Sequence, residues 1–151
     1  MRIVLQRVAR GRVSVEGRTV AEIGCGVVLL VGVSPGDSED QVQALAEKVA
    51  NLRIFEDQQG KMNLSIKEVN GEALVVSQFT LYADTRKGRR PSFTEAASPD
   101  FARSLVEHFA ACLSNLGLPT KSGEFGAHML VEIANDGPVT IWMDLPPAQE
   151  D

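Results

Sequence analysis

Two short polar segments, about sixty residues apart, carry the residue types from which a carbonyl-binding site can be built. The first, Ser77-Gln78-Phe79-Thr80-Leu81, ends an apolar stretch that is typical of a buried strand. The second, Asn135-Asp136-Gly137-Pro138-Val139-Thr140, separates two other apolar runs. Together they supply hydroxyl groups, backbone N–H donors and a conformationally restricted Gly-Pro dipeptide. Such groups can hold a carbonyl without a histidine or a metal ion.

Side-chain machinery for acid–base or nucleophilic catalysis is not evident elsewhere in the sequence. His108 lies near the edge of an apolar helix face, His128 lies in an alternating strand pattern, and neither has the partner that a catalytic triad requires. Cys25 and Cys112 lack C-x-x-C spacing and predict reduced thiols. We therefore expect no metal site and no cofactor. Backbone N–H groups of residues 78–80 are the predicted oxyanion donors.

Charge is unevenly distributed along a chain whose formal net charge is −5. This balance argues against a protein that coats nucleic acid nonspecifically, and no DNA partner is expected. A local basic run stands beside Phe93 and consists of Arg86, Lys87, Arg89 and Arg90. Such a run is either a solvated loop or a phosphate-binding patch, and the pattern leaves both interpretations open.

The elements that must position these groups follow from hydrophobic periodicity and turn residues. Helices are predicted from about Glu39 to Leu52, after Ser38, and from Ser98-Pro99 to about Leu116. Strands are predicted at 3–5, 13–15, 19–23, 27–33, 62–66, 73–81, 126–134 and 139–143. Strand alternation would place Gln78 and Thr80 on one face. Asn70-Gly71 signals a hairpin, and Gly137-Pro138 is expected at a turn between the last two strands.

This order of elements predicts a single α+β domain. We expect a curved, mostly antiparallel, barrel-like sheet covered by two main helices and spanning residues 1–145, followed by a disordered polar tail at 146–151. No apolar run approaches the roughly 20 residues of a membrane span. The first residues form a strand pattern and do not resemble a signal peptide, so a soluble cytoplasmic protein without a membrane partner is expected.

The ordered motifs, taken together, resemble the D-aminoacyl-tRNA deacylases, also called the D-tyrosyl-tRNA deacylase family. The resemblance runs from Met1 to about Asp144 and rests on Gln6-Arg7-Val8, Ser77-Gln78-Phe79-Thr80-Leu81, Arg89-Arg90-Pro91-Ser92-Phe93, Phe125-Gly126-Ala127-His128-Met129 and Asn135-Asp136-Gly137-Pro138-Val139-Thr140. It implies a homodimeric hydrolase that cleaves the ester between a D-amino acid and the 3′-terminal adenosine of tRNA. Glycine mischarged on the alanine tRNA is a further implied substrate.

Residue roles follow from the resemblance alone. Gly137-Pro138 would be a cis dipeptide that enters the partner subunit's site and excludes L side chains, and Arg7 would brace it. Phe125 and Met129 would line the adenosine pocket. The tRNA phosphates would contact the basic run of Arg86, Lys87, Arg89 and Arg90.

Two catalytic mechanisms are compatible with the family pattern. In one, the 2′-hydroxyl of the tRNA assists while backbone groups around Ser77, Gln78 and Phe79 hold the carbonyl. In the other, Thr80 is the nucleophile. An activated threonine needs an adjacent base, and none is evident, so we favour substrate assistance. Alternatives from other classes are a small-molecule ester or N-acyl hydrolase that uses Thr80, and a noncatalytic dimeric RNA-binding module, against which the acidic net charge counts.

Overall fold

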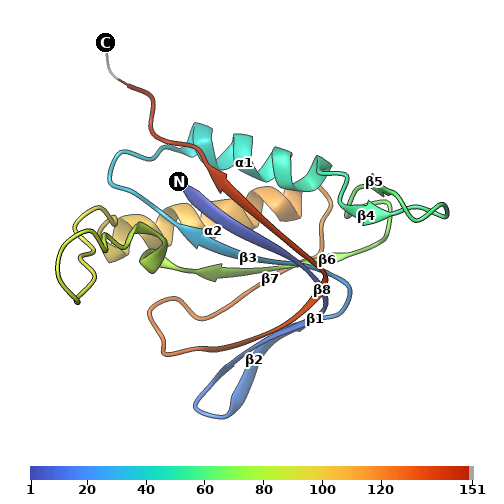
Figure 1. Ribbon diagram of the computed structural model, residues 1–151, viewed down its shortest axis with the longest axis horizontal. Coiled ribbons are helices and arrows are strands. Elements are labelled where there is room, and N and C mark those ends of the chain that lie inside the picture. Colours follow the sequence, from blue (N-terminus) through green and yellow to red (C-terminus); the bar gives the residue numbers. More distant parts are fainter. Residues whose placement is uncertain (150–151) are drawn as a thin grey trace.

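A strongly bent sheet with helices on one face forms the body of the protein (Figure 1). The computed structural model describes residues 1–149. The sheet strands are β1 (Arg2–Val15), β2 (Arg18–Ile23), β3 (Gly26–Gly32), β6 (Glu72–Ser77), β7 (Thr120–Ser122) and β8 (Leu130–Asp144). Their order is β2-β1-β3-β6-β7, and β8 pairs with β1. A separate two-stranded sheet pairs β4 (Phe55–Glu56) with β5 (Met62–Leu64).

Strand direction follows from the connections. β1 is antiparallel to β2, β3 and β8, whereas β3–β6 and β6–β7 are parallel. A parallel pair needs a long crossover, and α1 (Glu39–Asn51) and α2 (Pro99–Asn115) lie in these two crossovers. The predicted α+β class with two covering helices is confirmed, and the sheet is a mixed one that is nearly closed into a barrel.

Both helices begin where the sequence predicted. Ser38 caps α1, and its backbone N–H donates to Gln41 Oε1 at 2.8 Å. Ser98 precedes α2, and Pro99 occupies the first turn. The buried helix faces include Val42, Leu45, Val49, Leu105, Phe109 and Leu113. These side chains cover Leu29 and its neighbours on one sheet face, while Val28 belongs to a second apolar cluster on the other face. β3 is therefore buried on both sides, as predicted.

Three local predictions are wrong. Asn70-Gly71 does not join a hairpin, because β5 pairs with β4 while β6 pairs in parallel with β3. β6 ends at Ser77 and is followed by a 3₁₀ turn, η1 (Phe79–Tyr82), so the alternation expected through Leu81 stops early. The last two predicted strands are one strand, β8, which contains a bulge in place of a turn.

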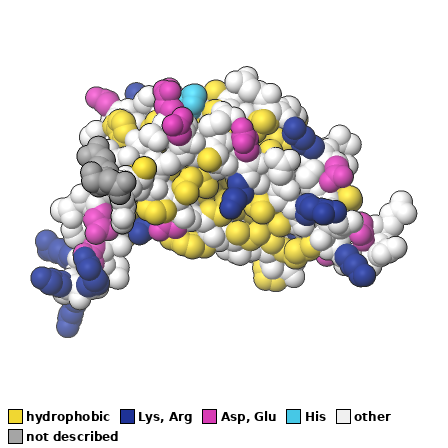
Figure 2. All heavy atoms as spheres, turned by 90° about the horizontal axis from the view of Figure 1, so that it is seen from above, with side chains coloured by type: hydrophobic (Ala, Val, Ile, Leu, Met, Phe, Trp, Pro, Cys, Tyr) yellow, Lys and Arg dark blue, Asp and Glu magenta, His cyan; other side chains and the backbone are white. Residues whose placement is uncertain are grey.

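Two peripheral segments lie outside the helices and strands. The segment from Asp84 to Ser92, here called the basic loop, projects from the end of the molecule next to η1 (Figure 1), and Lys and Arg side chains gather at that end in Figure 2. After β8, residues 145–149 are irregular, and the remainder of the predicted tail, Glu150 and Asp151, lies outside the described residues. No helix among residues 1–149 has the length and apolar character that a membrane crossing requires.

Candidate active site

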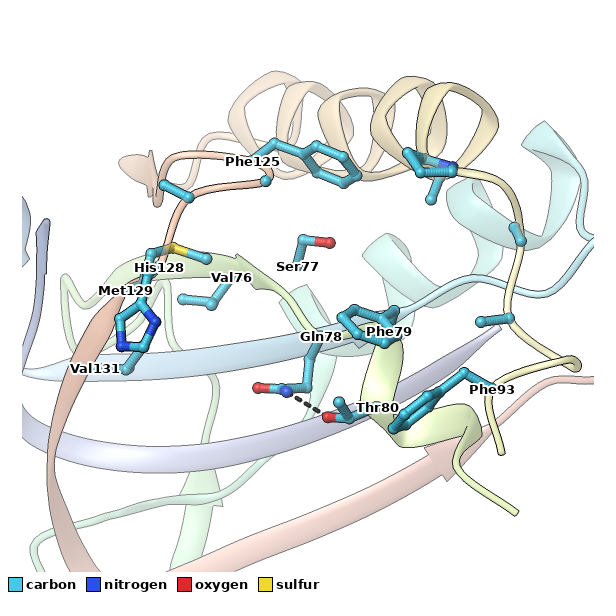
Figure 3. A pocket seen from close by; sticks show the side chains of 16 residues that line it. Val76, Ser77, Gln78, Phe79, Thr80, Phe93, Phe125, His128, Met129 and Val131 are labelled. Atoms are coloured by element: carbon cyan, nitrogen blue, oxygen red, sulfur yellow. Dashed lines mark hydrogen bonds between the residues drawn. The ribbon is translucent and has the colours of Figure 1, made fainter. Parts of the chain in front are cut away.

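A cavity of about 740 Å³ lies between the end of β6, the start of α2 and the segment before β8 (Figure 3). Small-molecule sites commonly have this size. All four predicted catalytic residues and both predicted adenosine contacts line it: Ser77, Gln78, Phe79, Thr80, Phe125 and Met129. The structure thus brings together segments that are about fifty residues apart in the sequence.

The turn after β6 determines which backbone N–H groups beside this cavity are already paired. Gln78 N–H donates to Val31 O at 2.7 Å, which continues the parallel pairing. The first amide bonded within η1 is that of Leu81, which donates to Gln78 O at 3.2 Å. The amides of Phe79 and Thr80 therefore have no acceptor inside the turn. The inclusion of the Gln78 amide among the oxyanion donors is wrong, and the other two remain available.

Gln78 and Thr80 do lie together, but not because of strand alternation. Gln78 Nε2 donates a hydrogen bond to Thr80 Oγ1 across the 3₁₀ turn (Figure 3). A carboxamide N–H is a donor and cannot take a proton from the hydroxyl. The geometry therefore orients the Thr80 side chain without activating it as a nucleophile.

The opposite wall is aromatic and apolar. Phe125 lies above the cavity in Figure 3, and the guanidinium of Arg103 on α2 lies 5.0 Å from the centroid of its ring. At this distance a cation–π interaction is favourable, and it holds Phe125 against the helix. A smaller hollow of about 130 Å³ adjoins the cavity and shares Ser77, Phe125 and Met129 with it. A bulky planar group fits such a wall better than a small polar metabolite does.

Several lining residues were not predicted. Phe93, Pro99 and His128 also border the cavity. Phe93 stands beside the basic run in the sequence, Pro99 is interpreted there only as a helix start, and His128 only as part of an alternating strand pattern. His128 is exposed at the rim, and Figure 3 shows its ring on the side of Met129 and Val131. No periodicity signals this grouping, because it arises from the packing of three separate segments.

The Gly137-Pro138 dipeptide lies outside the cavity of its own chain, at the bulge in β8. Val8 pairs with Asn135 and Gln6 pairs with Thr140, so residues 136–139 have no partner on β1 and form the bulge, with 136–138 exposed and Val139 buried. The Gly137-Pro138 peptide bond is cis. A Cβ on Gly137 would lie 3.0 Å from Arg7 Nη2, and its φ of +127° favours glycine.

Arg7 holds this bulge from inside the protein. The residue is 4% exposed, with Nε donating to Asp136 O at 3.1 Å and Nη1 donating to Ile54 O at 2.7 Å. The Glu56 carboxylate lies 3.8 Å from Nη2. From the other side, Asn135 Nδ2 donates to Arg7 O at 2.9 Å and to Val139 O at 3.0 Å. The dipeptide is thereby presented on a fixed support.

The basic run is less uniform than its sequence suggests. Arg86 pairs with Asp84 through Nε–Oδ1 and Nη2–Oδ2 contacts of 2.9 and 2.7 Å. Arg86 holds the pKa of the Asp84 carboxyl down at about 2, mainly through these side-chain hydrogen bonds and also through its backbone N–H. Lys87, Arg89 and Arg90 are exposed. The run thus divides into one paired arginine and three exposed cations.

Comparison with known proteins assigns the family. The model of the family described as D-Tyr-tRNA(Tyr) deacylase matches residues 4–144. The chain belongs to the D-Tyr-tRNA(Tyr) deacylase family. A D-aminoacyl-tRNA deacylase from Thermomicrobium roseum is 62% identical over 144 residues, covering 95% of this chain and 94% of that protein. One of the same name from Heliobacterium modesticaldum is 61% identical, with coverages of 95% and 96%.

Solved structures agree with the fold of this family member. A structure named c-Myc DNA unwinding element binding protein superimposes with a TM-score of 0.90 at 39% identity, covering 97% of this chain and 99% of that one. A probable eukaryotic D-amino acid tRNA deacylase gives a TM-score of 0.81 at 18% identity, covering 95% and 98%, which supports the fold alone. The predicted family is confirmed, and with it a hydrolase that acts on aminoacyl-tRNA esters.

Proposed function

We propose that this deacylase hydrolyses D-aminoacyl-tRNA in the cavity beside η1 and releases the free D-amino acid and tRNA. The observation that carries the proposal is a pair of backbone amides, Phe79 N–H and Thr80 N–H, which have no acceptor among residues 1–149 and belong to residues that line a largely apolar cavity. Two neighbouring backbone donors suit the oxygen of a carbonyl that becomes negatively charged. The names of the similar bacterial proteins support this substrate class.

The chemistry needs no protein nucleophile. A water molecule attacks the ester carbonyl carbon, and the charge that develops on the carbonyl oxygen is stabilised by the two amides. The 2′-hydroxyl of the terminal ribose positions the water, the bond to the 3′ oxygen breaks, and that oxygen takes up the proton that the attacking water releases. An oxyanion donor of this kind contributes about 2.7–4 kcal/mol to transition-state stabilisation.

Discrimination between D and L substrates is assigned to the bulge of a second copy. Gly137 and Pro138 are exposed, are braced by Arg7, and lie outside the cavity of their own chain. In the partner's cavity their carbonyl oxygens would occupy the space that an L side chain needs. Glycine has no side chain to exclude, so glycine mischarged on the alanine tRNA is also a substrate in this proposal.

This arrangement requires a homodimer, and the exposed apolar residues of β8 support one. Leu130 is 64% exposed and Trp142 is 53% exposed, on the same strand that carries the bulge. The two side chains lie toward opposite ends of the strand, beside Ser14 and Val4 of β1, and a second copy that lies along β8 would cover both. We further propose that Phe125 and Met129 contact the terminal adenosine, that Lys87, Arg89 and Arg90 contact tRNA phosphates, and that the enzyme works in the cytoplasm.

The test is release of amino acid from matched D- and L-charged tRNA under single-turnover conditions. We expect release from the D substrate and from glycyl-tRNA, while the L substrate remains intact. Equal activity on free D-amino acid esters would favour a small-molecule hydrolase. Binding of tRNA with no release of either enantiomer would favour a noncatalytic RNA-binding module.

A further inference from the structure

Two exposed aromatic rings stand on the rim of the cavity. Phe79 is 54% exposed and Phe93 is 38% exposed. Their ring centroids are 5.1 Å apart at an interplanar angle of 71°, an edge-to-face contact that Figure 3 shows beside Thr80. Exposed apolar area of this kind is stabilised when a flat ligand covers it.

The basic loop extends directly from this aromatic pair. Asp84 and Ser92 close the loop through two backbone hydrogen bonds of 2.7 and 2.9 Å, and Phe93 follows Ser92 immediately. The loop is therefore anchored at the rim of the cavity, and its tip projects outward (Figure 1). An extended ligand that leaves the cavity beside Phe93 would therefore lie close to this loop.

The loop presents three cations free of partners. Arg86 is held by Asp84, as described above. Among residues 1–149, no carboxylate lies within 4.0 Å of the charged groups of Lys87, Arg89 or Arg90. Their positive charge is thus available for an anionic ligand, and Figure 2 shows such side chains grouped at this end of the molecule.

We propose that the Phe79–Phe93 pair and the three free cations bind the single-stranded nucleotide immediately 5′ of the terminal adenosine. Its base stacks on the exposed aromatic surface, and the flanking phosphates contact Lys87, Arg89 and Arg90. Aromatic faces combined with cations are the combination by which proteins hold single-stranded RNA. The inference rests on the proposed function, which places the terminal adenosine in the cavity.

The decisive experiment tests whether the Phe93 ring and the penultimate base contribute to kcat/KM through the same contact. The substrates are a D-alanylated RNA hairpin with a tRNA-like single-stranded 3′ end and the same RNA with an abasic penultimate nucleotide. We expect kcat/KM of the wild-type protein to fall about tenfold on the abasic RNA. Phe93→Leu keeps apolar bulk but removes the ring. Its kcat/KM on the intact RNA should fall by a similar factor, and its kcat/KM on the abasic RNA should equal that of the wild-type protein on the abasic RNA.

The matched control is Phe101→Leu, because Phe101 is 37% exposed on α2 and does not line the cavity. It should behave as wild type on both RNAs. If Phe93→Leu and the abasic site each reduce kcat/KM, and the two factors multiply when they are combined, the proposal is overturned. So would an unchanged kcat/KM of the wild-type protein on the abasic RNA, since another occupant, such as an acidic peptide or a second copy, would then cover the rings.

Salt dependence tests the cations separately. Arg89→Ala should reduce the slope of log kcat/KM against log salt by about one, whereas Lys61→Ala, in the β4–β5 turn, should leave it unchanged. An unchanged slope for Arg89→Ala would contradict a contact between Arg89 and an RNA phosphate. Hydrolysis of D-alanyl-adenosine by the wild-type protein separates the two proposals. If neither this ester nor the charged RNA is hydrolysed, the proposed function fails; if both are hydrolysed equally well, only the nucleotide site fails.

Discussion

Thr80 is the residue that distinguishes the two catalytic mechanisms. Its hydroxyl accepts from Gln78, and its backbone amide is one of the two free donors. Substitution to valine removes the hydroxyl and retains the amide. We therefore expect single-turnover hydrolysis of D-aminoacyl-tRNA by Thr80→Val to stay within about tenfold of wild type, whereas a 2′-deoxy terminal adenosine should reduce hydrolysis about a hundredfold or more.

A suitable control for this pair is Thr19→Val on β2, which is exposed and does not line the cavity. It should retain full activity on the normal substrate. Loss of hydrolysis by Thr80→Val with tRNA binding preserved would make Thr80 the nucleophile and would contradict substrate assistance.

Asp84 is the residue whose ionisation reports on the basic loop. The Asp84 pKa of about 2 lies below the ordinary carboxyl pKa. At pH values above that ordinary pKa, the ion pair with Arg86 therefore stabilises the closed loop in full. The contribution is lost as the pH falls toward about 2. In Arg86→Gln, carboxyl NMR titration should show the Asp84 pKa rising toward about 3.9 without reaching it, because the backbone N–H of residue 86 remains.

Arg89→Gln provides the comparison for this titration, because Arg89 makes no contact with Asp84 in the described chain. The Asp84 pKa should then stay at its wild-type value. An Asp84 pKa that stays at about 2 in Arg86→Gln would assign the whole shift to backbone hydrogen bonds.

At the scale of elements, the bulge of β8 is the feature that positions Gly137-Pro138. Asn135 closes the bulge through a hydrogen bond to Val139 O and joins it to β1 through a hydrogen bond to Arg7 O. Asn135→Asp keeps the shape but removes both donors and leaves two carbonyls without their partner. We expect the free energy of unfolding to fall by about 1–3 kcal/mol, as measured by denaturant titration, and cleavage of L-aminoacyl-tRNA to increase.

Asn51→Asp is the matched substitution, because Asn51 Nδ2 also donates to a carbonyl, Glu47 O, but at the exposed end of α1. Its cost should be below about 0.5 kcal/mol. Equal costs for the two variants would show that Asn135 does not hold the bulge.

Elements with regular periodicity could be predicted from the sequence, and local departures from it could not. Both helices and the buried strand β3 follow from apolar spacing and caps. The turn η1 and the bulge of β8 do not, because tertiary pairing creates them: Gln78 bonds to Val31, and Arg7 draws in Asp136. Ser77-Gln78-Phe79-Thr80 could be assigned to a site because the four residues are contiguous in one motif. Phe93 and Pro99 could not, because they line the cavity only through the packing of segments that are distant in the sequence.

At the scale of the whole molecule, the proposed function makes each active site a product of two chains. The cavity belongs to one subunit, and the Gly137-Pro138 dipeptide comes from the other. Ala127→Trp, at a cavity-lining loop position, should fill the cavity and abolish hydrolysis while leaving the dipeptide intact. Pro138→Ala should leave the cavity open but lose discrimination, so that its homodimer cleaves both D- and L-aminoacyl-tRNA.

Mixing these two variants tests the geometry, because a heterodimer joins the open cavity of one subunit to the intact dipeptide of the other. With Ala127→Trp in excess and subunits allowed to exchange, cleavage of the L substrate should fall toward the wild-type level while cleavage of the D substrate persists. The same mixture, assayed after each homodimer has been cross-linked, should keep its L activity. If exchange leaves the ratio of D to L cleavage unchanged, the dipeptide acts within its own chain, and the proposed exchange of parts between subunits is wrong.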